Sequence, residues 1–128
     1  MKVFTNGCFD ILHKGHVELL AYCKSFGHVT VGLNSDESVR RLKGSSRPIN
    51  SESDRKRILE ALRYVDEVII FTEDTPYELL LKLRPDVIVK GGDYRAREVI
   101  GSDLCEVRIF QTLKGYSTTN IINQVSKK

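Results

Sequence analysis

Short, nearly continuous runs of Val, Ile and other β-forming residues recur along this chain, and stretches with helical spacing separate them. The runs cover residues 2–5, 28–33, 65–71, 86–90 and 106–110. Strands that are apolar on both sides are typical of parallel sheets with helices on both faces. The pattern therefore predicts a single α/β domain with a Rossmann-like, doubly wound sheet of five parallel strands.

The segments between these runs carry recognisable helix signals. We predict helices over residues 15–26, 36–43, 51–63 and 117–125, and a fifth that carries Leu79, Leu80 and Leu83 and ends before Pro85. Ser51 and Asp54 match a capping box. Thr75 is predicted as an N-cap, with Pro76 at the first helical position and Glu78 completing a second box. Residues 44–48 form the one clear loop.

Length and composition narrow the class of protein. The chain has 128 residues, of which 41% are hydrophobic and 29% charged, so we expect one globular domain over residues 1–128. A net charge of +3, from 20 basic and 17 acidic residues, is too even to predict nucleic-acid binding. No apolar run approaches the ~20 residues of a membrane span, and we expect no membrane partner. The absence of an apolar leader and the three cysteines without a CxxC pair favour a reduced, cytoplasmic protein.

The first strand leads into the segment with the most distinctive chemistry. Ligands of doubly wound sheets bind beyond the carboxyl ends of the strands. Here Gly7 allows a tight turn, and His13 and His16 flank Gly15 where the next helix begins. Backbone N–H groups at a helix N-terminus attract anions, and two imidazoles three residues apart can reach the same ligand. The segment therefore predicts a phosphate site.

Other interpretations of these residues stay open at this stage. The two histidines could be ordinary polar residues of a helix N-terminus, or zinc ligands with Cys8, although a fourth ligand is missing. Lys43 and Arg55 both lie in basic runs that could form solvated faces, and Asp93 could be a turn former.

The motifs resemble those of a known superfamily. Residues 5–10 (TNGCFD) and 13–16 (HKGH) are similar to the HxGH nucleotidyltransferases, in their cytidylyltransferase-like branch. The likeness continues in order through residues 34–36, 41–44, 46–48, 65–66, 73–76, 89–94 and 117–122. Within the branch, the chain most resembles the adenylyltransferase domain of bacterial ADP-heptose synthases, and next glycerol-3-phosphate cytidylyltransferase.

This resemblance implies a role for each matching residue. It implies catalytic roles for His13, His16 and Lys43, with the histidines on the triphosphate and Lys43 reaching the phosphates from a mobile loop. Implied nucleotide contacts are Cys8, Phe9, His13, His16, Gly91, Gly92, Asp93, Gly115, Ser117, Thr118 and Thr119. Asp10 and Arg55 would face the acceptor phosphate or the HxGH loop.

The resemblance also implies a reaction. The expected enzyme transfers AMP from ATP to a sugar phosphate such as heptose 1-phosphate and releases pyrophosphate. Mg²⁺ is expected on the NTP phosphates, with no metal site in the protein, and the assembly is expected to be a homodimer. A polyol-phosphate cytidylyltransferase and a non-catalytic nucleotide-binding module are the alternatives.

Two departures from the family pattern bear on the substrates. Thr112 stands where the cytidylyltransferases have an Arg, which favours ATP over CTP as the donor. The connection from Gly101 to Glu106 is shorter than expected for the heptose enzymes, which weakens the inference about the sugar.

Overall fold

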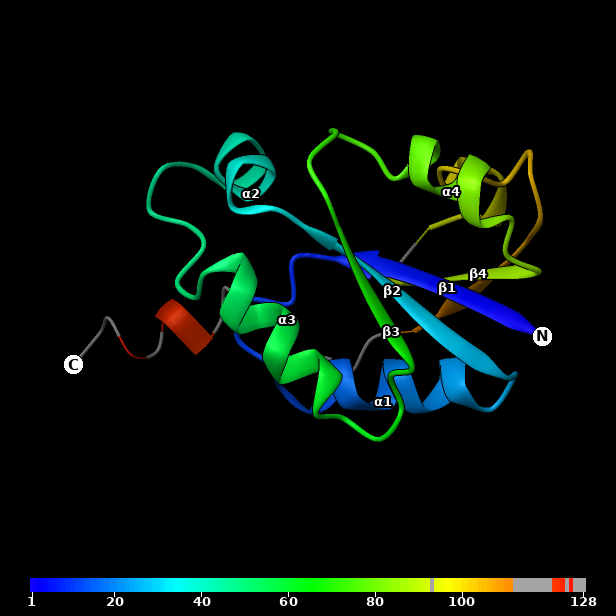
Figure 1. Ribbon diagram of the computed structural model, residues 1–128, viewed down its shortest axis with the longest axis horizontal. Coiled ribbons are helices and arrows are strands. Elements are labelled where there is room, and N and C mark those ends of the chain that lie inside the picture. Colours follow the sequence, from blue (N-terminus) through cyan, green and yellow to red (C-terminus); the bar gives the residue numbers. More distant parts are fainter. Residues whose placement is uncertain (93, 112–120, 124, 126–128) are drawn as a thin grey trace.

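The computed structural model describes residues 1–92, 94–111, 121–123 and 125. Its centre is a five-stranded sheet of order β3-β2-β1-β4-β5 in which every neighbouring pair is parallel (Figure 1). The strands are β1 (Lys2–Gly7), β2 (His28–Asn34), β3 (Glu67–Phe71), β4 (Val87–Gly91) and β5 (Glu106–Phe110). This is the predicted Rossmann-like fold, and the alternating apolar runs are its five strands.

Helices connect the strands on both sides of the sheet. They are α1 (Lys14–Lys24), α2 (Asp36–Lys43), α3 (Glu52–Glu60) and α4 (Tyr77–Leu83), with a short 3-10 helix, η1 (Ala96–Glu98), before β5. Figure 1 shows α1 and α3 below the sheet and α4 above it. Residues 121–123 are helical as predicted, and the predicted span 117–120 lies outside the described residues. Within the described part of the chain, no helix has the length and apolar character needed to cross a membrane.

The helix boundaries follow the capping chemistry. The Ser51 hydroxyl accepts a hydrogen bond from the Asp54 amide at 3.2 Å, as the capping box predicts. The prediction for α4 was wrong by one residue: Pro76 occupies the cap position without a side-chain cap, and the helix starts at Tyr77. Glu78 is then the second helical residue, and a capping box requires the third. The predicted helix over 51–63 also ends earlier, at Glu60, because residues 61–64 form turns before β3.

The core consists of one apolar layer on each face of the sheet. Val87 and Val89 of β4 pack into the larger layer with residues of α1, whereas Ile88 packs with Leu80 of α4 in the smaller one. Side chains of a strand alternate between faces, so Lys90 follows Ile88 to the α4 side. Burial on both faces explains why β2 and β4 are apolar runs, whereas the edge strand β5 alternates and contains no buried residue.

The central strand β1 separates from its neighbour β4 toward the carboxyl end of the sheet. β1 pairs with β2 from Lys2–His28 to Gly7–Leu33, but it pairs with β4 only at Val3–Val87 and Phe4–Ile88. Both strands continue beyond these pairs, to Gly7 and Gly91. The strand order reverses at this point, which is where doubly wound sheets bind their ligands.

Candidate active site

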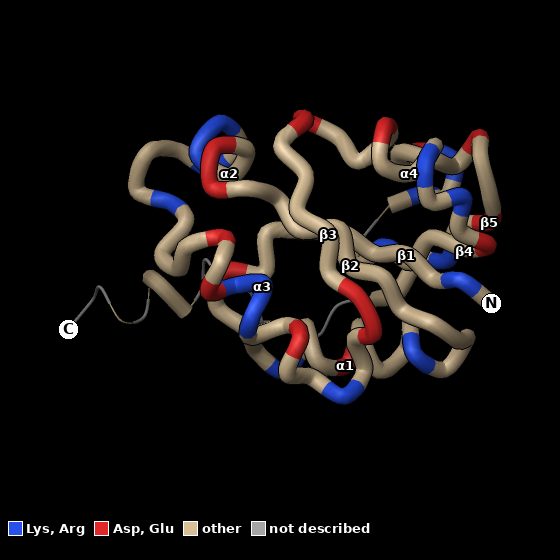
Figure 2. Tube along the Cα trace, in the orientation of Figure 1, with Lys and Arg blue, Asp and Glu red and all other residues tan. Residues whose placement is uncertain are grey.

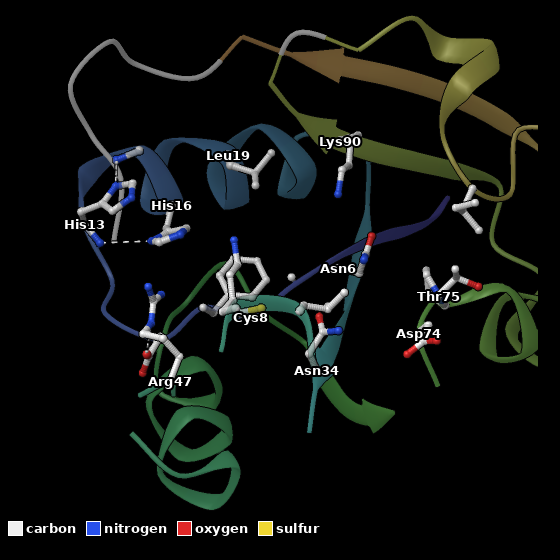
Figure 3. A pocket seen from close by; sticks show the side chains of 18 residues that line it. Asn6, Cys8, His13, His16, Leu19, Asn34, Arg47, Asp74, Thr75 and Lys90 are labelled. Carbon is white, nitrogen blue, oxygen red and sulfur yellow. Dashed lines mark hydrogen bonds and ion pairs between the residues drawn. The ribbon is translucent and has the colours of Figure 1, made fainter. Parts of the chain in front are cut away.

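A cavity of about 520 Å³ lies at the carboxyl end of the two central strands (Figure 3). Its walls come from the ends of β1 and β4, the N-terminus of α1, the end of α2 and the loop between β3 and α4. His13 and His16 lie at one end of the view, and Asn34, Asp74 and Thr75 lie at the other. The fold thus gathers into one cavity the segments that follow β1, β2, β3 and β4.

The two histidines form the cap of α1. His13 is the N-cap, and its Nδ1 accepts a hydrogen bond from the Gly15 amide at 3.0 Å. Nδ1 of His16 accepts one from the His13 backbone amide at 3.2 Å. The two rings stack with their centroids 3.9 Å apart. These contacts fix both rings, because each Nδ1 satisfies an amide that the helix itself leaves unpaired.

The same contacts set the protonation of the pair. Burial lowers the pKa of His16 to about 4, with a further contribution from His13 beside it. Burial also lowers the pKa of His13. Both rings are therefore neutral at pH 7, and since each Nδ1 accepts a hydrogen bond, each hydrogen resides on Nε2. The helix N-terminus thus presents two neutral N–H donors, as an anion site requires.

The loop between β1 and α1 is compact because Phe9 turns back under it. Phe9 has a φ of 45°, is 5% exposed, and its ring centroid lies 5.2 Å from that of His16. A side chain at Gly7 would approach this ring to 3.1 Å, so a larger residue would disturb the turn. Cys8 lines the cavity, and burial raises the pKa of its thiol. A protonated thiol is a poor nucleophile, which is evidence against covalent catalysis by Cys8.

Arg55 of α3 hydrogen-bonds to the backbone of residues that line the cavity. Its side chain is fully buried, so the surface-charge interpretation of this residue is wrong. Nη1 donates to the carbonyls of Cys8 at 2.8 Å and Asn34 at 2.7 Å. The other nitrogens donate to the Asn50 carbonyl at 3.0 Å and to Asp36 Oδ1 at 2.8 Å. Arg55 therefore ties the HxGH loop to the end of β2 and to the starts of α2 and α3.

Asp10 has a related role in the loop that follows α2. It is 2% exposed and accepts hydrogen bonds from the amides of Ile49 at 2.7 Å and Asn50 at 2.8 Å. Arg47 Nε lies 3.3 Å from its carboxylate. The structure thus places Asp10 against this loop, whose first residue, Gly44, follows Lys43 directly.

The lysines around the cavity come from opposite sides. Lys43 is exposed in the last turn of α2, where basic residues oppose the acidic first turn, as Figure 2 shows. Lys90 extends from the end of β4 and is half-buried. Burial lowers its pKa, and the charge of Lys43 lowers it further. The sequence analysis missed Lys90, although a lysine that ends an apolar strand before two glycines is a usable signal.

Of the remaining predicted site residues, the structure describes Gly91 and Gly92. Gly91 ends β4, and Gly92, with a φ of 119°, donates its amide to the Phe110 carbonyl at 3.0 Å. Asp93, Gly115, Ser117, Thr118 and Thr119 lie outside the described residues, as does Thr112. The cavity also contains polar residues that the sequence analysis did not select, namely Asn6, Asn34, Arg47, Asp74 and Thr75.

The described residues contain no group of three or more His, Cys, Asp or Glu side chains placed to hold a metal ion. The carboxylates that line the cavity within this part of the chain are Asp10 and Asp74. Each is engaged by an arginine, Asp10 by Arg47 and Asp74 by Arg41, whose Nε lies 3.0 Å from Oδ1.

A helix-capping histidine pair at the switch point of this sheet is the arrangement of nucleotidyltransferases, enzymes that take a nucleoside triphosphate as donor. The family model described as cytidylyltransferase-like matches residues 4–124, and the chain belongs to that family. Its relatives include the bifunctional protein HldE of Campylobacter curvus, 58% identical over 96% of this chain. HldE of Helicobacter pylori strain J99 is 54% identical over 98%. The chain spans about a quarter of these relatives, 27% of each.

Solved structures agree with this assignment. The lipopolysaccharide core biosynthesis protein from Thermoplasma volcanium is 29% identical, with a TM-score of 0.73 over 91% of this chain and 98% of that one. Pantoate-beta-alanine ligase from Francisella tularensis is 16% identical, with a TM-score of 0.60 over 99% of this chain and 72% of that one. The second likeness shows the fold alone.

Proposed function

We propose that this enzyme transfers AMP from ATP to a sugar phosphate similar to heptose 1-phosphate and releases pyrophosphate. The observation that carries the proposal is the stacked pair of His13 and His16 at the N-terminus of α1, whose Nδ1 atoms accept backbone hydrogen bonds that fix both rings. The relatives named HldE and the structure titled as a lipopolysaccharide core biosynthesis protein support a sugar acceptor. The family's resemblance to ADP-heptose synthases supports AMP as the transferred group.

The proposed chemistry requires no protein nucleophile. An oxygen of the acceptor phosphate attacks the α-phosphorus of ATP, one P–O bond forms, and the bond between the α-phosphorus and the bridging oxygen breaks. Negative charge grows on the departing pyrophosphate. Neutral Nε2–H groups of His13 and His16 donate to these oxygens, and because their rings are fixed in advance, little reorganisation is needed.

Magnesium would arrive with the triphosphate. Both carboxylates of the described cavity are engaged by arginines. The residues present therefore fit a cation held by phosphate oxygens and waters, which is the usual mode of Mg²⁺ in nucleotide enzymes. Bound in this way, it would neutralise part of the phosphate charge.

ATP is proposed as the donor in preference to CTP. Thr112 replaces the Arg with which the cytidylyltransferase segment opens, so a donor for the nucleotide is missing. An unpaired buried polar group costs about 1–3 kcal/mol. Gly91 and Gly92 carry no side chains of their own, which favours approach of a base to the backbone there.

The test is a matrix of nucleotides and acceptors with pyrophosphate release as the readout. We expect ATP with a sugar 1-phosphate to give the highest kcat/KM. His16→Ala serves as the inactive control, and His28→Ala, on an exposed histidine outside the cavity, serves as the active one. A preference of tenfold or more for CTP would make the protein a polyol-phosphate cytidylyltransferase. Nucleotide binding without any pyrophosphate release would make it a binding module.

The setting of the enzyme is a further part of the proposal. We place it in the cytoplasm, and its cysteines Cys8, Cys23 and Cys105 are free thiols. We also expect a homodimer, by resemblance to the family. Light scattering on the purified chain measures the oligomeric state directly, and a monomer at micromolar concentration would contradict the expectation.

A further inference from the structure

Lys90 is placed at the opening of the sheet by the register of its strand. Val89 before it is fully buried, and the preceding Ile88 is 1% exposed. Continuing the pairing of Phe4 with Ile88 puts Asn6 level with Lys90, on the same face of the neighbouring strand. Figure 3 shows the Lys90 side chain extending from β4 into the cavity, with its amino group turned toward the space between Cys8 and Asn6.

The part of the chain that the structure describes supplies no carboxylate to pair with the charge of Lys90. Among the described residues, neither Lys90 nor Lys43 forms an ion pair with a carboxylate. Lys90 instead lies 5.5 Å from the centroid of the Tyr94 ring. A half-buried ammonium group without an anion loses hydration and gains little in return. A ligand with negative charge would offset this cost.

We propose that Lys90 binds the phosphate group of the acceptor, an inference that rests on the proposed function. An ammonium group forms charge-assisted hydrogen bonds with phosphate oxygens. Lys90 lies across the cavity from His13 and His16 in Figure 3. In an in-line displacement, the attacking oxygen and the departing pyrophosphate lie on opposite sides of the α-phosphorus. The histidines hold the triphosphate side, and Lys90 therefore holds the attacking side.

The cavity also has room for the body of such an acceptor. A second hollow of about 160 Å³ adjoins the first and shares Asn6, Pro76, Lys90 and Ile100 with it. Its lining includes Tyr94 and Glu98, whose hydroxyl and carboxylate suit the hydroxyl groups of a sugar. Lys90 lies at the junction of the two hollows, so a phosphate bound there would leave the sugar in the smaller one.

The test separates the acceptor from ATP by steady-state kinetics. Lys90→Met keeps the length of the side chain and removes its charge, Lys90→Arg keeps the charge, and Lys82→Met on the exposed surface of α4 is the matched control. We expect Lys90→Met to raise the KM for the acceptor by about tenfold to a hundredfold, as for loss of a charged hydrogen bond. The KM for ATP should change less than threefold. Lys90→Arg should recover most of the loss.

Two results would overturn the assignment. If Lys90→Met raises the KM for ATP and leaves that for the acceptor unchanged, Lys90 serves the triphosphate. If neither KM changes, Lys90 binds no phosphate. The rise in Tm caused by glucose 1-phosphate, measured with a non-hydrolysable ATP analogue already bound, gives a readout without turnover. Loss of that rise in Lys90→Met, with retention in Lys82→Met, would support the phosphate site. Failure of every acceptor in the matrix to be converted would count against the proposed function alone.

Discussion

Arg55 bonds to the backbone of two residues that line the cavity, Lys90 lines it directly, and the two cations differ in how the protein satisfies them. Arg55 is fully buried, and three backbone carbonyls and the carboxylate of Asp36 accept its hydrogen bonds. Lys90 is half-buried, and no carboxylate among the described residues pairs with it. A buried cation with four hydrogen bonds to the protein supports the structure, whereas one without a carboxylate among the described residues is available to a ligand. The number of hydrogen-bond and ion-pair partners therefore distinguishes a structural cation from one that can bind a ligand.

The largest effect expected from this comparison is on stability. Arg55→Leu removes the link between the HxGH loop, β2 and α3 and leaves the carboxylate of Asp36 and three carbonyls without their donor. We expect a loss of about 3–5 kcal/mol in the free energy of unfolding, measured by urea denaturation. Arg57→Leu on the exposed side of the same helix should change it by less than about 0.5 kcal/mol. Equal losses in the two variants would contradict the structural role of Arg55.

The next effect is on turnover without a loss of fold. His16→Ala removes a donor at the N-terminus of α1 and should lower kcat by about 10²–10³, as for other donors to developing charge. Circular dichroism should show that the helices and the sheet persist. A variant with nearly normal kcat would show that His16 does not act in the transition state. His16 would then belong with the residues that only stabilise the fold.

A smaller effect is expected for Asp10, which holds the loop that follows α2. Asp10→Asn keeps the size of the side chain but weakens its hold on the amides of Ile49 and Asn50 and on Arg47. We expect a loss of about 1–3 kcal/mol in the free energy of unfolding. Cleavage near Gly44 by a protease should also become faster and should slow again with saturating ATP and Mg²⁺. Cleavage that is insensitive to nucleotide would show that Lys43 and its loop do not close on it.

The last effect concerns acid. His16 has a pKa of about 4 in the folded protein, below its ordinary value of 6.5, so between these values the unfolded chain binds a proton that the folded one does not. Lowering the pH from 6.5 toward 4 should therefore destabilise the protein by at most about 1.4 kcal/mol per pH unit from this residue. His16→Asn, which cannot titrate, should show a shallower fall in Tm over the same interval. Parallel curves for the two proteins would mean that His16 is not held neutral by burial.

The sequence could predict those features that depend on neighbouring residues. The bounds of α2 and β5 agree with the predicted ranges. In both segments the spacing of polar and apolar residues along the chain is enough to indicate the element. The HxGH segment could be recognised for the same reason. Arg55 and Lys90 could not be separated in this way, since both are basic residues next to structured segments. What distinguishes them is the set of partners that folding brings from β1, β2 and α2, which local spacing does not contain.

The two roles of His13, one in the helix cap and one in the proposed reaction, constrain how the sequence can evolve. Its Nδ1 caps α1, a task that Ser, Asp or Asn performs as well or better, while in the proposed function its other nitrogen binds the triphosphate. A population selected for heat resistance alone would therefore accept replacements at this position that a population selected for turnover would reject. Heat resistance and turnover compete here within one imidazole ring, so sequences evolved under the first pressure should lose this histidine before they lose Arg55.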